Sequence, residues 1–239
     1  MKALVAQVRA ETRMSMRRSE SVLVTLGIPL LLLLFFGTVD LLPNAGREPL
    51  DFLVPSVLAL AVMSTAMVNL AISTGFERQY GVLKRLGTTP LGRPRLMGAK
   101  TAVVGLIEVV QMVAITFVGL LLGWRPAGSV ALAMLAVFVG TAAFAGLGLL
   151  MAGTLRAEGT LAVANGTYIV LLLAGGIAVP IESLPAGLGA LAALTPSAAL
   201  SGVLVAVLGA EAAPVGSWLV LGIWAVAAPL AAARWFRWE

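Results

Sequence analysis

The sequence contains no cysteine and no histidine, and only 11% of its 239 residues are charged. Without cysteine there is no disulfide framework and no thiol nucleophile, and without histidine there is no imidazole base. Carboxylates are then the remaining side chains suited to holding a metal ion. Because most hydrolytic and redox enzymes depend on the missing groups, we do not expect this chain to be an enzyme.

Apolar residues are abundant instead. They make up 60% of the chain, and the mean hydropathy is +1.02. Soluble domains carry about 25% charged residues. A soluble domain of 24.6 kDa with this composition would lack the polar surface to cover its own core. The sequence therefore predicts an all-α integral membrane protein that forms a single domain over residues 1–239.

Six segments have the length of about 20 apolar residues that a helix needs to cross a bilayer. The predicted spans are residues 22–41, 52–74, 101–122, 130–151, 160–179 and 215–233. Between the last two, residues 180–208 are mostly apolar but contain Pro180, Pro185 and Pro196. A seventh span through this stretch would place Pro196 in mid-helix, at a cost of about 3 kcal/mol. We predict a pair of short re-entrant helices there instead.

The basic residues predict an orientation. The chain has 16 Lys and Arg, and all but Arg47 and Arg125 fall on one side of the six predicted spans. Because cytoplasmic loops of membrane proteins are enriched in Lys and Arg, both termini are expected in the cytoplasm. This placement also explains the formal charge of +5 without nucleic acid as a partner.

The first 20 residues carry Arg9, Arg13 and Arg17 on one helical face. This spacing predicts an amphipathic helix over residues 1–20 that lies on the cytoplasmic leaflet and contacts lipid phosphates. A disordered basic tail is the alternative interpretation.

Residues 75–100 form a long basic loop between the second and third spans. In it, Val82, Leu83 and Leu86 give a short helix an apolar edge, and Pro90 ends that helix. Such a helix at the ends of two spans could dock into a groove on another protein. The alternative is a solvated loop that only sets the topology, and the periodicity does not decide between the two.

The loop resembles the corresponding loop of type-2 ATP-binding-cassette (ABC) exporter permeases, which reads close to E-R-x-x-G-x-L-x-x-L-x-x-T-P-x-x-R with a following Lys. The matching residues are Glu77, Arg78, Gly81, Leu83, Leu86, Thr89, Pro90, Arg93 and Lys100. One departure is Gly87, where many relatives carry a larger residue. The segment with Pro180, Glu182, Pro185 and Pro196 likewise resembles the re-entrant region of that family.

The resemblance implies that this loop holds a coupling helix that contacts a separate ATPase subunit, with two ATPase subunits per complex. The residues implied in that contact are Glu77, Arg78, Gly81, Val82, Leu83, Leu86, Pro90 and Arg93. No phosphate-binding loop of the G-x-x-x-x-G-K-[ST] type occurs in the sequence. We therefore expect ATP and Mg to be bound by the partner, with no cofactor in this chain. A second permease copy or a homologous permease would complete the pathway, in a bacterial inner membrane.

A few polar residues lie within the predicted spans. Glu108 is about 10 Å into the third span, with Gln111 one turn later on the same face. We name Glu108, Gln111, Asn69 and Asn165 as candidates for the translocation path. The alternative is structural, with Glu108 tied to Asn69 or to the other protomer, and Asn165 tied between helices.

The leading hypothesis is the permease subunit of an ABC exporter for a hydrophobic or amphiphilic, drug-like substrate. Lipid-linked or polysaccharide cargo is the alternative within that class. The rival from another class is a proton-coupled carrier that uses Glu108 as its relay. A membrane scaffold without transport is a third, weaker interpretation.

Overall fold

The computed structural model describes residues 19–39, 48–87, 93–178 and 180–237. Within these ranges the side chains of residues 19–25, 86, 87, 93–95, 182 and 186 are not described. The predicted amphipathic helix over residues 1–20 therefore lies almost wholly outside the described residues, and so does Pro90.

Every element in the described part of the chain is a helix. In chain order they are α2 (Ser19–Thr38), α3 (Pro49–Val62), η1 (Met63–Asn69), α4 (Leu70–Gln79), α5 (Val82–Gly87), α6 (Arg93–Leu121), α7 (Val130–Thr154), α8 (Ala157–Ala174), η2 (Ile181–Ser183), α9 (Ala186–Ala192), α10 (Pro196–Leu208) and α11 (Val215–Trp235). α3, the π-helical turn η1 and α4 follow one another without a break, because the residues at both junctions keep helical backbone angles.

Five helical segments are long and apolar enough to cross a membrane, if α3, η1 and α4 are taken together as one. They are residues 49–79, 96–121, 130–154, 157–174 and 215–235. α2 is also apolar, but its described side chains begin only at Leu26, so the described segment Leu26–Thr38 is shorter than a span. The all-helical, multi-pass architecture predicted from composition is confirmed for the described residues, and the count of six spans stays a prediction.

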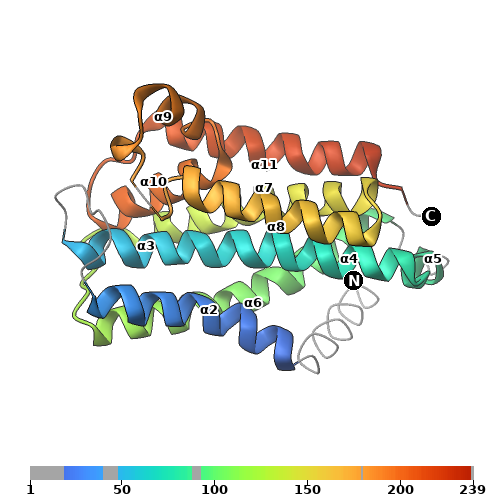
Figure 1. Cartoon of the computed structure of the whole chain (residues 1–239), viewed down its shortest axis with the longest axis horizontal. Helices are drawn as coiled ribbons and strands as arrows, with labels where there is room; N and C mark the ends of the chain where they lie inside the picture. Colours follow the sequence, from blue (N-terminus) through green and yellow to red (C-terminus); the bar gives the residue numbers. More distant parts are fainter. Residues whose placement is uncertain (1–18, 40–47, 88–92, 179, 238–239) are drawn as a thin grey trace.

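Helix α7 lies at the centre of the bundle. It packs against α11, α4, η1 and α10, while α3 lies between α2, α6 and α10 (Figure 1). α7 contains several glycines, and small residues let the backbones of neighbouring helices approach closely. A Cβ added at Gly146 would come within 2.4 Å of Pro229 N in α11, and one at Gly148 within 2.7 Å of the Met67 carbonyl in η1.

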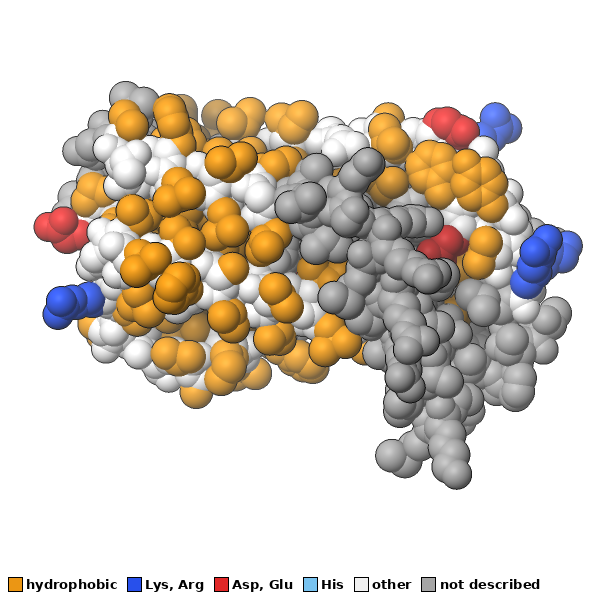
Figure 2. Space-filling model, turned by 90° about the horizontal axis from the view of Figure 1, so that it is seen from below, with side chains coloured by type: hydrophobic (Ala, Val, Ile, Leu, Met, Phe, Trp, Pro, Cys, Tyr) orange, Lys and Arg blue, Asp and Glu red, His pale blue; other side chains and the backbone are white. Residues whose placement is uncertain are grey.

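The two ends of the bundle differ in charge. α4 and α5 lie at the same end as the last residues of α7 and α11 and the start of α8 (Figure 1). The described Lys and Arg side chains at this end are Arg78, Lys84, Arg85, Lys100, Arg156, Arg234 and Arg237. At the opposite end the structure describes Arg125. Figure 2 shows hydrophobic side chains along the face between the ends, where lipid tails would lie.

The proline-rich segment after α8 folds at the end opposite to α5. α8 ends at Ala174, before the predicted boundary at 179, and Gly176 then adopts φ +71°, which glycine tolerates. Pro196 occupies the first turn of α10, where its missing amide is not needed. Residues 187–208 therefore do not form one continuous helix. The 13 residues of α10 are too few for a complete span.

Candidate functional site

The basic end of the bundle is built around the turn between α4 and α5. Gly81 allows this turn because its φ is +70°, a backbone conformation that favours glycine. Its amide donates to the carbonyl of Arg78 at 3.0 Å, and its own carbonyl accepts from the amide of Arg85 at 3.2 Å. The chain thus leaves one helix and immediately enters a second, short one at a fixed angle.

In and next to the short helix α5, some side chains are exposed and others are buried. Leu83 is only 1% exposed, whereas the neighbouring Val82 is 37% exposed and Tyr80 is 71% exposed. Tyr80 stacks on Phe76, with ring centroids 6.1 Å apart. Leu83 therefore anchors α5 to this chain, so a contact with another protein would be made by its exposed neighbours. The side chains of Leu86 and Arg93 are outside the described residues.

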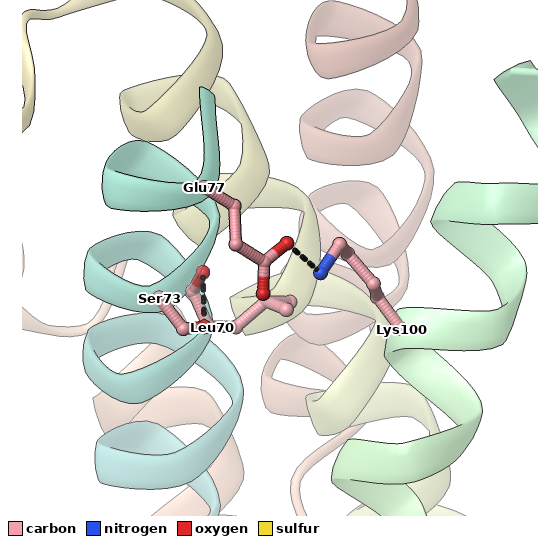
Figure 3. Close-up of polar contacts among 4 residues, drawn as sticks. All are labelled: Leu70, Ser73, Glu77 and Lys100. Atoms are coloured by element: carbon pink, nitrogen blue, oxygen red, sulfur yellow. Dashed lines mark hydrogen bonds and ion pairs between the residues drawn. The ribbon is translucent and has the colours of Figure 1, made fainter. Parts of the chain in front are cut away.

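An ion pair joins α4 to α6 just inside this end. Lys100 Nζ lies 2.5 Å from Glu77 Oε2, and the Lys100 side chain is 5% exposed (Figure 3). One turn earlier on α4, Ser73 donates to the Leu70 carbonyl at 3.2 Å. The charge of Lys100 is compensated where it is removed from water, as a buried ion requires.

The two residues after Glu77 extend the connections to other helices. Arg78 donates to the carbonyl of Leu155, the residue after α7, and to the carbonyl of Arg237 at 3.5 Å, beyond α11. Gln79 Nε2 donates to Glu158 Oε1, in the first turn of α8, at 3.1 Å. Three consecutive residues of α4 thus reach α6, the residue after α7, α8 and the segment after α11.

Within the bundle, the predicted path residues of α6 are buried and bonded to neighbouring helices. Glu108 is 2% exposed, and its Oε2 lies 2.5 Å from Thr141 Oγ1 in α7. Gln111, at 1% exposure, accepts from Thr65 Oγ1 in the π-helical turn at 3.0 Å. Glu108 Oε1 has no hydrogen-bond partner. The structure brings together these two residues with Thr65 and Thr141.

The two predicted asparagines are not part of this cluster. Asn69 is the last residue of η1 and is half-buried. The residue of η1 that bonds to α6 is Thr65, the partner of Gln111, and not Asn69. Asn165 lies on the exposed face of α8, where Nδ2 donates to the Leu161 carbonyl at 2.8 Å. The four predicted path residues therefore do not form one continuous surface in a single chain.

At the opposite end, the three prolines mark where short helices begin. Pro180 precedes η2, Pro185 precedes α9 and Pro196 opens α10. The Glu182 side chain is outside the described residues. The backbone amides of Ala127 and Gly128 both donate to the Leu208 carbonyl, at 3.1 and 3.0 Å, which ties the end of α10 to the loop between α6 and α7.

A family model described as ABC-2 type transporter matches residues 2–208. The chain belongs to this family. ABC-2 transporter proteins of this kind are membrane subunits that normally work with an ABC ATPase, which agrees with the resemblance carried by residues 77–100. The chain is therefore a multi-pass transporter subunit. No curated protein matches the chain.

Several interacting residues of this ABC-2 chain were missed by sequence reasoning. Thr65 and Thr141 carry no signal in the sequence, because a hydroxyl in an apolar helix usually bonds its own backbone. Glu158, the partner of Gln79, lies in the first turn of α8, far from Gln79 in the sequence. The match to the family pattern singled out Lys100 as a functional candidate. Its pairing with Glu77 could not be predicted, because the pair depends on how α4 and α6 pack. Among the described residues, no three Asp or Glu side chains are close enough to hold a metal ion.

Proposed function

We propose that this chain is the permease subunit of an ABC exporter, and that its ATPase binds at the end formed by α4 and α5. The observation that carries the proposal is the set of bonds from Glu77, Arg78 and Gln79 to four other parts of the bundle. A partner that pushes on α5 would move α4, and these bonds would transmit the movement to α6, α7 and α8.

The exposed surface of this end suits a protein partner. Tyr80 and Val82 offer an apolar contact, and Lys84 and Arg85 beside them are exposed cations. Tyrosine and arginine side chains, such as those of Tyr80 and Arg85, are enriched where proteins bind each other, whereas lysine is depleted there. Two ATPase subunits would bind ATP and Mg, and a second permease copy or a homologous permease would complete the pathway. Membrane lipids would surround the complex.

The orientation follows from the charges. The basic end, with Lys84, Arg85 and Arg234, would face the cytoplasm of a bacterial cell, because Lys and Arg are retained on that side. Both termini and α5 would then be cytoplasmic. α2 would provide the first of six spans, and η2, α9 and α10 would form the re-entrant region at the outer surface, where the cargo leaves.

The cargo we propose is a hydrophobic or amphiphilic, drug-like molecule. Support comes from the apolar helices and from the short connections at the outer end, such as residues 122–129 between α6 and α7, which leave little protein outside the bilayer. Lipid-linked or polysaccharide cargo is the alternative. Glu108 and Gln111 already bond Thr141 and Thr65 of their own chain, which favours a structural role for them. Asn165 is the predicted path residue that can still face a cargo or a second protomer.

Transport by inside-out vesicles tests the proposal. The chain would be co-expressed with a candidate ABC ATPase, and uptake of ethidium would be followed by fluorescence. We expect uptake that requires ATP and that is lost when the ATPase is omitted. Uptake driven by a proton gradient without ATP would contradict the exporter and support a carrier. If lipid-linked cargo stimulated ATP hydrolysis and ethidium did not, the assignment as an exporter would stand, but the proposal of a drug-like cargo would be overturned.

A further inference from the structure

Among the described residues, no charged side chain lies close to the Glu108 carboxyl group. The helices packed against α6 are α2, α3, η1 and α7. α7 and η1 contain no titratable side chain. α3 carries Asp51 in its first turn, at the opposite end of the bundle, and α2 carries Glu20 near its start. On α6 itself, Lys100 is two turns away, about 12 Å along the axis, and pairs with Glu77.

The two contacts of the Thr141 hydroxyl group bear on whether Glu108 carries a proton. Its oxygen lies 2.5 Å from Glu108 Oε2 and also 2.8 Å from the carbonyl oxygen of Val137. A threonine hydroxyl has one hydrogen to donate and two lone pairs that accept. It can therefore donate to only one of these two oxygens. A carbonyl oxygen has no hydrogen, and a hydrogen shared between both oxygens would make two weak bonds, so a second full hydrogen bond needs a hydrogen on the carboxyl group of Glu108.

We infer that Glu108 is a proton-binding site, held as a neutral carboxylic acid that donates from Oε2 to Thr141. Thr141 then donates its own hydrogen to the Val137 carbonyl, and both short contacts are satisfied. An ionised Glu108 would accept the hydrogen of the Thr141 hydroxyl group. The oxygen atoms of Thr141 and of the Val137 carbonyl would then face each other with no hydrogen between them. It would also leave the partnerless Oε1 of a carboxylate buried between apolar helices.

The neutral form also agrees with the cost of charge at this depth. An unpaired carboxylate in an apolar interior is among the most expensive groups to bury, whereas a neutral acid with one hydrogen bond costs far less. The acid thus becomes a link between α6 and α7 that carries no net charge. With Gln111 and Thr65, it holds α6 against both α7 and the π-helical turn.

A permanently protonated Glu108 differs from a proton relay. A relay must release its proton in each cycle, and release from Glu108 would break one of the two bonds of Thr141. In the bonded arrangement of Glu108, Thr141 and Val137 the proton stays, and α6 and α7 move as one body. The chemistry of this link is independent of which cargo or ATPase the chain uses.

Infrared spectroscopy of the full-length protein in lipid bilayers at pH 7 tests the assignment. We expect the carbonyl band of a protonated carboxylic acid that disappears in Glu108→Gln, whose amide can donate to Thr141 in the same way and so preserve the fold. Thr141→Val should shift this band because the acid loses its acceptor, whereas Thr141→Ser should leave it in place. The two Thr141 variants report on the natural Glu108, so the test does not depend on folding of Glu108→Gln.

Two results would overturn the proposal. One is a spectrum in which Glu108→Gln removes carboxylate bands and no acid band, because the residue would then be ionised. The other is an acid band that is unchanged in Thr141→Val, because the proton would then not be donated to Thr141.

Discussion

At the scale of single residues, the ion pair between Glu77 and Lys100 holds α4 to α6 at the proposed coupling end. The exposed fractions differ, 22% for Glu77 against 5% for Lys100, so removal of the carboxylate leaves the more buried partner uncompensated. Loss of one partner of a fully buried pair costs about 3–5 kcal/mol. Because Glu77 is partly exposed, solvent screening lowers the expected loss to about 1–3 kcal/mol.

We therefore expect Glu77→Gln to lower the melting temperature of the protein in detergent. Glu158→Gln is the matched control, since Glu158 accepts from Gln79 on the exposed surface and its loss should change the melting temperature little. The exchanged pair Glu77→Lys with Lys100→Glu should recover part of the loss. Equal melting temperatures for Glu77→Gln and Glu158→Gln would contradict the role assigned to the ion pair.

At the scale of helices, α7 is held against α11 by a backbone contact that only glycine permits. A Cβ on Gly146 would meet Pro229 N at 2.4 Å and the Ala228 carbonyl carbon at 2.6 Å, and backbone atoms cannot rotate aside. Gly146→Ala should destabilise the bundle by about 1–3 kcal/mol through overpacking. Gly105→Ala in α6 is the control. It meets nothing within 4 Å and should gain up to about 1 kcal/mol from helix propensity.

Melting temperatures of the two glycine variants in detergent provide the measurement. We expect shifts of opposite sign for Gly146→Ala and Gly105→Ala. A Gly146→Ala protein that melts at the temperature of the natural protein would show that the backbones of α7 and α11 are not in close contact at Gly146.

The sequence predicted most of the long helices, because runs of about 20 apolar residues, with a proline or glycine at several of the boundaries, are local signals. Pro196 was correctly expected to prevent one long helix, since a proline without an amide belongs in a first turn. The π-helical turn Met63–Asn69 was not predicted. It lies against Gly148 of α7, so it depends on a partner distant in the sequence.

The candidate site was predicted less completely, for a similar reason. The family pattern included Gly81 but did not predict the turn that the structure shows there, where φ is +70°. Periodicity also placed Leu83 on an apolar edge, but it could not show that this edge faces the chain's own core. The bonds of Glu108 to Thr141 and of Gln111 to Thr65 connect separate helices, and pairing across helices has no signature within either one.

At the scale of the whole molecule, the distribution of charge predicts which end faces the cytoplasm. The natural chain has no cysteine, so single cysteines can be introduced without a background. Val82→Cys is exposed at the basic end, and Ala127→Cys is exposed at the opposite end. An impermeant maleimide should label Ala127→Cys in intact cells and Val82→Cys in inside-out vesicles.

Leu83→Cys provides the internal control for this experiment. Its position is adjacent to Val82 but buried, so it should react slowly from either side in the folded protein. Labelling of Val82→Cys in intact cells would place α5 outside the cell and overturn the orientation. Fast labelling of Leu83→Cys would contradict the packing of α5 against the bundle.

The measurement that tests the central claim most directly is cross-linking of this end to an ATPase. Val82→Cys and Ala127→Cys would each carry a short photoactivated cross-linker, in membranes that also contain a co-expressed candidate ABC ATPase. We predict that Val82→Cys is joined to the ATPase, that the yield changes when ATP is added, and that Ala127→Cys is not joined to it. An assembled complex in which Val82→Cys gives no cross-link, or in which Ala127→Cys does, would contradict the binding of the ATPase at α5.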